Sequence, residues 1–338
     1  MFVKSISFSI LLIAGIFLGL IFIPRHYSVP ELKKRETTQF WNLSTGSRIA
    51  YTLIPGKGKK KDYPVIFLQG GPGGPINDWN IMTFAPLAEE GYDVYLYDQI
   101  GCGLSARLTN INDYTVERHK RDLEEIVKLL GVHKVILVGQ SWGAMLSALF
   151  IADNPEKVAQ AVFTGPGPLL PENNKLEKIH PPDSLHLKNP EFTNRQVKKK
   201  VYTLRGRFVE FCAERFNWKL ASDKEMDNFY CVLNDEMAKS TVKTPSVLNK
   251  PESGSGYYCM LKTVQSFPAV PDTRPKLANC KIPVLIMRGQ YDGIKWGYVT
   301  EYLKLFSNSK LIIVQNAGHS IAREQPDIYI QTIREFLK

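Results

Sequence analysis

Short apolar segments that alternate with helical patterns constrain the fold of this chain most. Six segments rich in Val, Ile, Leu and aromatic residues recur along the sequence, at residues 64–68, 93–98, 134–139, 160–165, 283–289 and 310–315. Continuous apolar runs of this length are typical of parallel strands that are buried on both faces. Residues 39–54 add a predicted hairpin that turns at Thr45 and Gly46. The sequence therefore predicts an α/β fold with a mostly parallel, doubly wound sheet of about eight strands.

The regular alternation stops between about Pro166 and Ala278. This stretch has clustered prolines, a basic run at residues 195–207 and helix-like segments, but no clear strand. We expect a mainly helical cap over residues 166–278, inserted above the carboxyl edge of the sheet. The core is then made of residues 27–165 and 279–338. The basic run is interpreted as a solvated helix face.

The first 26 residues form a separate unit. Residues 6–23 carry no charge, and as a helix they would extend about 27 Å, close to the thickness of a hydrocarbon core. No small-x-small cleavage site follows before Pro24. The sequence predicts a single N-terminal membrane anchor with an exported body, and a cleaved secretory signal is the alternative. The net charge of +10 would suit an acidic membrane surface.

The cysteine and charge patterns exclude several classes of partner. The five cysteines contain no CxxC pair and no Cys/His cluster at zinc spacing, so we expect no structural metal. Cys212 and Cys231 are one possible disulfide. No nucleic-acid-binding motif accompanies the basic charge, and no nucleic-acid partner is expected.

Ser141 occupies a corner between a predicted strand and a predicted helix. In residues 134–145, KVILVGQSWGAM, the strand ends at Gly139 and the helix begins near Trp142. The GxSxG spacing lets a serine adopt a strained turn, because residues without a β-carbon stand two positions before and after it. The turn would raise the hydroxyl above the sheet, with the Trp142 N–H at a helix N-terminus.

A serine nucleophile needs a base, and the base needs an acid that holds its tautomer. His319 is the histidine that follows a predicted strand at its carboxyl end, and Asp292 follows the preceding strand. The order Ser141, Asp292, His319 is the order that this sheet topology requires. Asp98 is the alternative acid, with hydrogen bonding inside its own turn as its competing role. His119 lies on the helix predicted at residues 114–131 and is expected on its surface.

A glycine-rich loop follows the third predicted strand. Residues 67–75 read FLQGGPGGP, and the glycines would let the backbone approach a substrate carbonyl. We expect the Gly71 N–H to form an oxyanion hole with the Trp142 N–H. A phosphate-binding loop is the competing interpretation, but there is no GxxxxGK[ST] pattern and no dinucleotide fingerprint downstream.

The motifs QGGPGG, DQIGCGLS, GQSWGAM, GQYDG and NAGHS occur in this order. Together they resemble the α/β-hydrolase superfamily, and specifically its proline iminopeptidase branch. The resemblance covers about residues 39–165 and 282–338. It implies a serine peptidase that removes N-terminal residues, proline above all, from short peptides, with a helical cap and no cofactor. It also implies Ser141 as nucleophile, His319 as base, Asp292 as its orienting acid, and Gly71 with Trp142 as the oxyanion hole.

The sequence departs from this family at three places. Gln69 stands where the family has His, and Ile100 stands where it has Arg. The family's cap also carries a Trp-x-x-Trp-Glu element whose carboxylate helps to hold the substrate ammonium, and residues 207–216, RFVEFCAERF, lack it. Glu210 and Glu214 are the candidate replacements, with ordinary exposed helix positions as the alternative interpretation. A buried ammonium requires such a carboxylate.

Three functions follow from the sequence. The first is a membrane-anchored aminopeptidase of proline iminopeptidase type, with a small peptide as substrate. The second is an esterase, lipase or lactonase that uses the same Ser141, Asp292 and His319. The third is a non-catalytic protein that is tethered to a membrane and binds a ligand.

Overall fold

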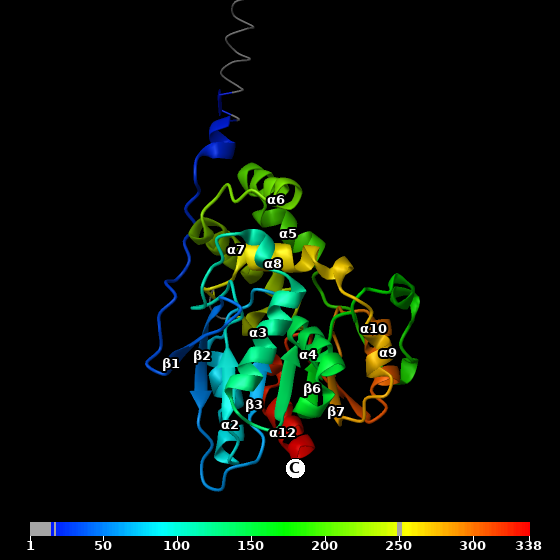
Figure 1. Cartoon of the computed structure of the whole chain (residues 1–338). Coiled ribbons are helices and arrows are strands. Elements are labelled where there is room, and N and C mark those ends of the chain that lie inside the picture. Colours follow the sequence, from blue (N-terminus) through cyan, green and yellow to red (C-terminus); the bar gives the residue numbers. More distant parts are fainter. Residues whose placement is uncertain (1–14, 17, 249–251) are drawn as a thin grey trace, which may run out of the picture.

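The computed structural model describes residues 15–16, 18–248 and 252–338 of the 338-residue chain. In this part of the chain an eight-stranded sheet runs through the molecule, with helices on both of its faces (Figure 1). The strands are β1 (Thr38–Asn42), β2 (Arg48–Ile54), β3 (Val65–Leu68), β4 (Val94–Tyr97), β5 (Val135–Gln140), β6 (Val158–Thr164), β7 (Val284–Gly289) and β8 (Ser309–Val314). The expected eight strands are therefore confirmed.

The strand order is β1-β2-β4-β3-β5-β6-β7-β8. β1 and β2 form the expected hairpin, closed by the Leu43 N–H donating to the Ser47 carbonyl at 2.8 Å. β2 is antiparallel to β4 as well, whereas β3 to β8 are all parallel. The chain moves outward from β3 in both directions, so the strand order reverses between β3 and β5. Ligands of open α/β sheets bind beyond the carboxyl ends of the strands at such a point.

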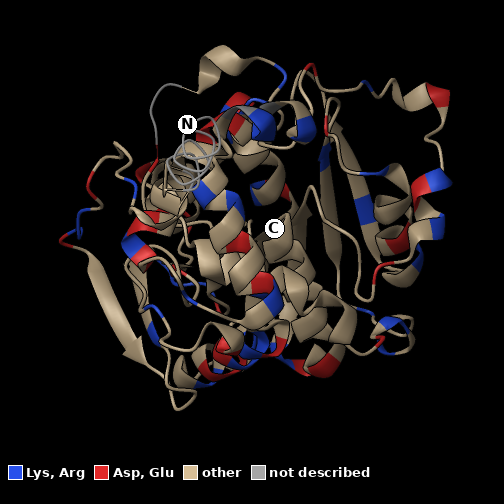
Figure 2. Ribbon diagram, turned by 90° about the horizontal axis from the view of Figure 1, so that it is seen from above, with Lys and Arg blue, Asp and Glu red and all other residues tan. Residues whose placement is uncertain are grey.

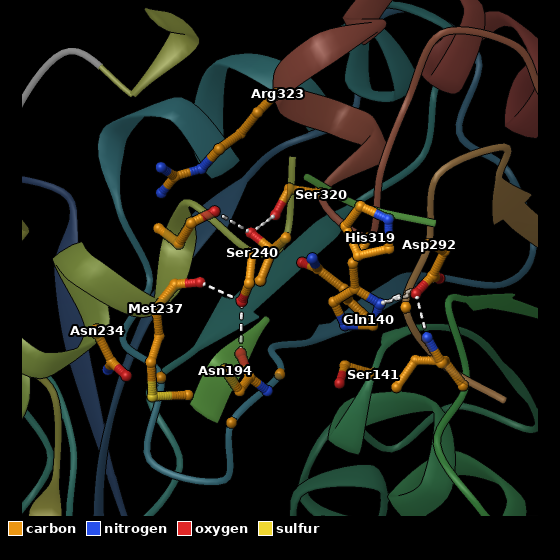
Figure 3. A pocket seen from close by; sticks show the side chains of 18 of the residues that line it. Gln140, Ser141, Asn194, Asn234, Met237, Ser240, Asp292, His319, Ser320 and Arg323 are labelled. Atoms are coloured by element: carbon orange, nitrogen blue, oxygen red, sulfur yellow. Dashed lines mark hydrogen bonds and ion pairs between the residues drawn. The ribbon is translucent and has the colours of Figure 1, made fainter. Parts of the chain in front are cut away.

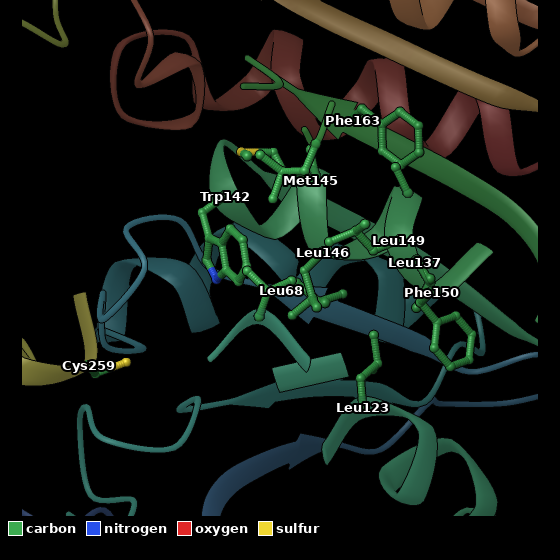
Figure 4. Packing of buried hydrophobic residues seen from close by; sticks show 14 of the residues in the cluster. Leu68, Leu123, Leu137, Trp142, Met145, Leu146, Leu149, Phe150, Phe163 and Cys259 are labelled. Carbon is green, nitrogen blue, oxygen red and sulfur yellow. The ribbon is translucent and has the colours of Figure 1, made fainter. Parts of the chain in front are cut away.

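Two apolar clusters lie on the two faces of the sheet. Alternate residues of β3 divide between them, because successive side chains of a strand point to opposite faces: Ile66 and Leu68 enter one cluster, and Val65 and Phe67 the other. Figure 4 shows part of the first cluster, in which buried side chains of the helix after β5 pack on the sheet. The first face is covered by α3 (Val116–Leu129), α4 (Trp142–Asp153) and α10 (Trp296–Leu305), and the second by α2 (Asp78–Glu89), α11 (Ile321–Glu324) and α12 (Pro326–Leu337).

The residues between β6 and β7 form the helical insertion. Where the structure describes this stretch, it contains helices and loops but no strand. Its helices are α5 (Asn194–Val201), α6 (Leu204–Phe216), α7 (Asp223–Ala238), α8 (Tyr257–Gln265) and α9 (Arg274–Leu277). Figure 1 shows α5 to α8 above the carboxyl edge of the sheet and α9 beside α10. Short 3₁₀ helices lie at Ile111–Asp113, Pro155–Lys157, Asn174–Lys178, Asp183–Leu185, Pro245–Val247 and Phe267–Ala269. The boundaries at 165/166 and 278/279 stay predictions.

Helix α3 lies within the range predicted for it, residues 114–131, with one correction to the placement of its side chains. Val116, Leu123, Ile126 and Val127 are buried, but so is His119, whose side chain we had expected on the surface. Helix α8 of the insertion covers this side of α3, and His119 Nε2 lies 3.0 Å from the Thr263 hydroxyl. The sequence pattern of α3 alone cannot show which of its polar side chains a distant segment covers.

The first 26 residues, here called the leader, are only partly within the described residues. Residues 15–16 and 18–22 are helical, and residues 1–14 and 17 lie outside the description. Among the described residues, no helix is long and apolar enough to cross a membrane. The end of the leader helix contacts the insertion, where Arg205 Nη1 donates a hydrogen bond to the Ile21 carbonyl at 2.6 Å. All five cysteines are buried free thiols, so the possible disulfide between Cys212 and Cys231 is not formed.

Candidate active site

Ser141 lies in a sharp turn between β5 and α4. Its φ is 54° and its ψ is −114°, a conformation that is unusual for any residue with a β-carbon. A β-carbon at Gly139 would lie 2.4 Å from the Gly143 carbonyl oxygen, and one at Gly143 would lie 2.0 Å from the Leu68 carbonyl oxygen. The two glycines therefore allow the strand and helix to approach closely enough to form the turn. This is the local geometry that the GxSxG spacing predicts.

His319 and Asp292 form a hydrogen-bonded pair at the same edge of the sheet. Asp292 follows β7 and His319 follows the adjacent strand β8, so the parallel pairing of these strands brings their following loops together. His319 Nδ1 lies 3.1 Å from each of the two carboxylate oxygens of Asp292. Arg288, buried in β7, donates from Nη2 to the carbonyls of Asp292 and Ile294 and so holds the Asp292 loop.

The electrostatics of this pair favour charge on both partners. Burial alone would raise the pKa of Asp292, but His319, Arg288 and the hydrogen bond from the Ile294 N–H hold that pKa below its usual value. Burial would likewise lower the pKa of His319, but the Asp292 carboxylate raises it above 6.5. An imidazole beside such a carboxylate can accept a proton readily on its other nitrogen.

Gly165, at the end of β6, lies beneath this pair. A β-carbon there would lie 2.7 Å from His319 Nδ1 and 3.0 Å from Asp292 Oδ2, so any other residue would displace the ring. Its φ of 50° also favours glycine. We did not predict this role from the sequence. The glycine that ends an apolar run in VFTGPGP is the signal that could have pointed to it.

Ser141 and His319 line the same cavity, where Figure 3 shows them together with Asp292. Among the described residues, no hydrogen bond joins the Ser141 hydroxyl to the His319 ring. Nδ1 faces Asp292, which leaves Nε2 as the ring nitrogen that can accept a proton from Ser141. Such hydrogen bonds are often long in ligand-free enzymes and tighten when substrate binds.

The two expected oxyanion donors belong to segments that adjoin Ser141. Gly70 and Gly71 follow β3 and line the cavity, and Trp142 is the first residue of α4. Neither the Gly71 N–H nor the Trp142 N–H donates to an acceptor in the part of the chain that the structure describes. Both N–H groups therefore remain available for a ligand, and the N-terminus of α4 adds a favourable dipole.

A buried glutamine, Gln99, connects the loop that carries Gly71 to the start of the helix at Trp142. We did not identify this role from the sequence. Gln99 is 2% exposed. Its Nε2 donates to the Gln69 carbonyl at 2.9 Å, and its Oε1 accepts from the Trp142 indole at 2.8 Å. One side chain thus joins the loop after β3 to the start of α4. The signal in the sequence is the polar Asp-Gln pair directly after the apolar strand β4.

Gln69, at one of the departures from the family pattern, is held by hydrogen bonds. Its Nε2 donates to the Pro75 carbonyl and to Asn80 Oδ1, both at 3.2 Å, and its Oε1 accepts from the Gly70 N–H at 3.0 Å. These bonds fix the glycine-rich loop from inside. Ile100, at the second departure, is fully buried in the apolar core.

Asp98, the alternative acid, is held by backbone groups of its own turn and of the loop after β3. Its carboxylate accepts hydrogen bonds from the backbone N–H groups of Ile76 at 2.7 Å and Leu104 at 2.8 Å. Burial raises its pKa to about 6 despite these bonds. The structure places Asp98 outside the lining of the cavity that Ser141 shares with His319.

The cavity has a volume of about 740 Å³, and the insertion supplies much of its lining. Polar side chains predominate, and several are labelled in Figure 3. Two carboxylates besides Asp292 line it, Asp235 on α7 and Glu252. Glu252 is engaged by three neighbours: it pairs with Arg323 and accepts hydrogen bonds from the Trp79 indole and the Asn77 amide.

Glu210 and Glu214 do not reach this cavity. Both lie on α6, where Glu210 accepts a hydrogen bond from the Tyr202 hydroxyl at 3.0 Å and Glu214 is exposed. Neither lines the cavity. Our choice of these two residues as candidates for substrate binding is therefore not supported by their placement. The cause is the position of α6, which packs on the outer side of the insertion, whereas α7 faces the site.

Comparison with known proteins agrees with this geometry. Residues 63–326 match the model of the α/β-hydrolase fold family. The chain belongs to this family. It is a hydrolase, and its sequence is proline iminopeptidase-like: it is 24% identical over 305 residues to a proline iminopeptidase of Saccharolobus solfataricus, covering 86% of this chain and 89% of the relative.

Other hydrolases are similar over comparable lengths. A 2-hydroxy-6-oxononadienedioate/2-hydroxy-6-oxononatrienedioate hydrolase of Klebsiella pneumoniae is 26% identical over 311 residues, covering 89% of this chain and 96% of that protein. The solved structure of an α/β fold family hydrolase from Bacillus anthracis has a TM-score of 0.62 at 21% identity, covering 89% of this chain and 99% of that one. The family and the fold are thus established, whereas the substrate is a separate question.

Proposed function

We propose that this hydrolase is a serine aminopeptidase of proline iminopeptidase type. In the proposed reaction, Ser141 Oγ attacks the carbonyl carbon of the N-terminal residue while His319 Nε2 takes the hydroxyl proton. Asp292 orients the imidazole and stabilises its cationic form. The Gly71 and Trp142 N–H groups donate to the oxyanion. Each such donor typically contributes about 3 kcal/mol of transition-state stabilisation.

The same groups would complete the reaction. His319 returns its proton to the leaving amine, which departs and leaves the N-terminal residue esterified to Ser141. Water then enters, loses a proton to His319 and attacks the ester. The N-terminal amino acid is released and the serine is regenerated.

The observation that supports an aminopeptidase is a carboxylate in the cavity without a cationic partner. Asp235 lines the cavity with Ser141 and accepts a hydrogen bond from the Glu252 backbone N–H at 3.3 Å. Arg323 and Lys239 are near enough to act on its charge, but neither forms an ion pair with it. Burial raises its pKa to about 6, against the influence of Arg323, so it is mainly ionised at neutral pH. A partly desolvated carboxylate of this kind gains most from a ligand that brings a positive charge. The α-ammonium of a peptide is such a group, and we assign Asp235 to it in place of Glu210 or Glu214.

The test compares a substrate that carries an ammonium with one that does not. Asp235→Asn should lower kcat/KM for a prolyl amide on the order of 100-fold, because the ammonium loses a buried partner. The same variant should hydrolyse a short acyl ester within a few-fold of the parent rate. Glu210→Gln and Glu214→Gln are matched controls, and we expect both to leave both substrates nearly unchanged.

Other outcomes of this assay favour the alternative functions. Rapid turnover of the acyl ester by the parent chain, with no turnover of amides, would identify an esterase, lipase or lactonase that uses the same serine. If neither substrate turns over and a fluorophosphonate does not label Ser141, a non-catalytic binding protein is the better description.

The leader supports a second part of the proposal, its cellular placement. Residues 6–23 are uncharged and apolar, and we propose that they anchor an exported body in a membrane. Alkaline extraction of membranes from cells that express the full chain tests this, because an anchored chain stays with the lipid. Release of a shortened chain into the medium would support the alternative of a cleaved signal.

A further inference from the structure

Exposed apolar side chains are concentrated at one end of the molecule. Among the described residues, fourteen large apolar side chains are exposed, and ten of these belong to two neighbouring segments. One segment is the leader, and the other is α6 with the residues that follow it. Figure 1 shows both at the end of the molecule that is farthest from α2 and α12. The ten are Ile16, Leu18, Leu20, Phe22, Ile23, Leu204, Phe211, Phe216, Trp218 and Leu220.

Three aromatic rings of the second segment form a continuous exposed group. The ring centroids of Phe211 and Phe216 are 5.7 Å apart, and those of Phe216 and Trp218 are 5.0 Å apart. Their exposed fractions are 52%, 46% and 57%. Scattered apolar residues are normal on a soluble surface, but a contiguous aromatic group marks a surface that contacts a partner. Trp and Phe are also the residues that insert most readily at a lipid–water interface.

The leader is held against α6, the helix that carries Phe211 and Phe216. The Phe22 and Phe208 rings are in edge contact, with centroids 5.7 Å apart. Arg205, which donates to the Ile21 carbonyl, forms a buried ion pair with Glu225. Glu225 in turn accepts a hydrogen bond from the Arg25 backbone N–H at 3.0 Å. The chain therefore passes from the uncharged run at residues 6–23 to the body of the protein at α6.

The surrounding charge is positive. Residues 195–225 contain nine Lys and Arg against four Asp and Glu, and one of the nine, Arg205, is buried in its ion pair with Glu225. The side chains of Lys198, Lys199, Arg207 and Arg215 are exposed. Figure 2 looks onto this end of the molecule and shows Lys and Arg on several of its helices, interspersed with Asp and Glu. Basic residues around an apolar group attract an anionic lipid surface.

We propose that α6 and the segment 217–220 rest on an anionic lipid bilayer, with Phe211, Phe216 and Trp218 among the head groups. This inference goes beyond the proposed function, because neither peptide hydrolysis nor an N-terminal anchor requires α6 to touch lipid, although its choice of a bilayer rests on the proposed anchor. A bilayer fits better than a second protein because the exposed group continues into the leader, whose uncharged run has the length of a membrane span. The insertion that forms one side of the cavity is then held against the membrane surface.

An environment-sensitive fluorophore can test this contact in the full chain. The label is attached at Phe216→Cys or, as control, at Met82→Cys; Met82 is 69% exposed on α2, and the five native cysteines are buried. Each protein is reconstituted as a single copy in nanodiscs of mixed phosphatidylglycerol and phosphatidylcholine. We expect a blue shift and a several-fold rise in emission at position 216 relative to the same protein in detergent-free buffer or in pure phosphatidylcholine, and quenching by spin-labelled lipid. Position 82 should show none of these changes.

A charge reversal provides the second measurement. Arg207→Glu combined with Arg215→Glu should abolish most of the signal at position 216 and leave hydrolysis of a soluble substrate unchanged. Lys281→Glu with Lys310→Glu, two exposed lysines at the opposite edge of the sheet, is the matched control and should retain the signal. Equal emission at positions 216 and 82 in anionic nanodiscs would overturn the proposal. So would a signal that appears only when two copies occupy one disc, which would indicate a second copy as partner. The fluorescence does not depend on turnover, and alkaline extraction reports the anchor separately, so failure of this proposal is distinguishable from failure of either part of the proposed function.

Discussion

The loops at the strand ends and the helical insertion line the same cavity, but they hold their side chains in different ways. Ser141 follows β5 and Asp292 follows β7, and each of these strands is paired with a neighbour on both sides. His319 follows β8, which is paired with β7 at the edge of the sheet. Asp235 and Glu252 belong to the insertion, where the packing of one helix on another decides which side chains face the cavity. The sheet thus fixes the groups that would perform the chemistry, and the insertion contributes the groups that would select the substrate.

The largest expected effect on turnover comes from removing the side chains that follow the strands, here called the strand-end groups: Ser141, Asp292 and His319. Ser141→Ala or His319→Ala should lower kcat/KM on the order of 10⁴-fold or more for both a prolyl amide and an acyl ester, because both reactions use the same nucleophile and base. Steady-state kinetics on the two substrates measures this. His133→Ala is the matched control, since His133 is exposed at the amino end of β5. A loss of only a few-fold in either Ser141 or His319 variant would show that other residues carry the reaction.

The strand-end groups could be predicted from sequence for a physical reason. A buried parallel strand is recognisable from its continuous apolar residues, and the sheet places the carboxyl ends of such strands at one edge. The residues that follow each strand are then placed at this edge. For Ser141 the turn itself also has a sequence signature, because a β-carbon at Gly139 or Gly143 would lie only 2.4 or 2.0 Å from a backbone oxygen. The close approach of Gly165 to His319 could not be predicted in this way, because the two residues follow different strands.

The insertion could not be predicted in the same detail. Residues 207–216 and the helix α7 both have helical patterns with carboxylates, and nothing in either pattern tells which one faces Ser141. We chose Glu210 and Glu214, but the packing turns α7 and its Asp235 toward the cavity. His119 was misplaced for the same reason, because the segment that covers it is 144 residues away in sequence. Contacts between distant helices leave no local periodicity to read.

A smaller effect is expected from substitution of Gln99, which connects the loop after β3 to the start of α4. Gln99→Leu removes both of its hydrogen bonds and leaves the Gln69 carbonyl and the Trp142 indole without a partner. We expect kcat to fall on the order of 100-fold for amide and ester alike, with little change in KM, because the donors at Gly71 and Trp142 are no longer held in position. Gln160→Leu, which removes a hydrogen bond to the Phe336 carbonyl far from the site, is the control. A change in KM alone would assign Gln99 to substrate binding instead.

The pH dependence of the amide and ester reactions should separate the contribution of His319, at a strand end, from that of Asp235, in the insertion. His319 acts as a base only when neutral, and its pKa is raised above 6.5, so both reactions should slow as the pH falls through that pKa. The amide reaction also needs ionised Asp235, whose pKa is raised to about 6. Below about pH 6 the amide rate should therefore fall more steeply than the ester rate, by about a further tenfold for each pH unit. In Asp235→Asn the two profiles should become parallel; a difference that persists in this variant would assign the second ionisation to another group.

The smallest kinetic effect is expected where the two regions meet. His119 of α3 and Thr263 of α8 join the core to the insertion through one buried hydrogen bond of 3.0 Å, beside the Trp142 ring. Burial lowers the pKa of His119 to about 3, so the imidazole is neutral and the contact should not change between pH 5 and 9. Thr263→Val leaves the imidazole without this partner and should lower the free energy of unfolding by about 1–3 kcal/mol, as measured by urea denaturation. Ester turnover should stay within a few-fold, because Ser141, Asp292 and His319 depend on the sheet and not on α8.

Thr332→Val, on the exposed side of α12, is the control for the loss of a hydroxyl. A large loss of ester turnover in Thr263→Val would show that the insertion also positions the chemical groups, and the division between the two regions would then be wrong.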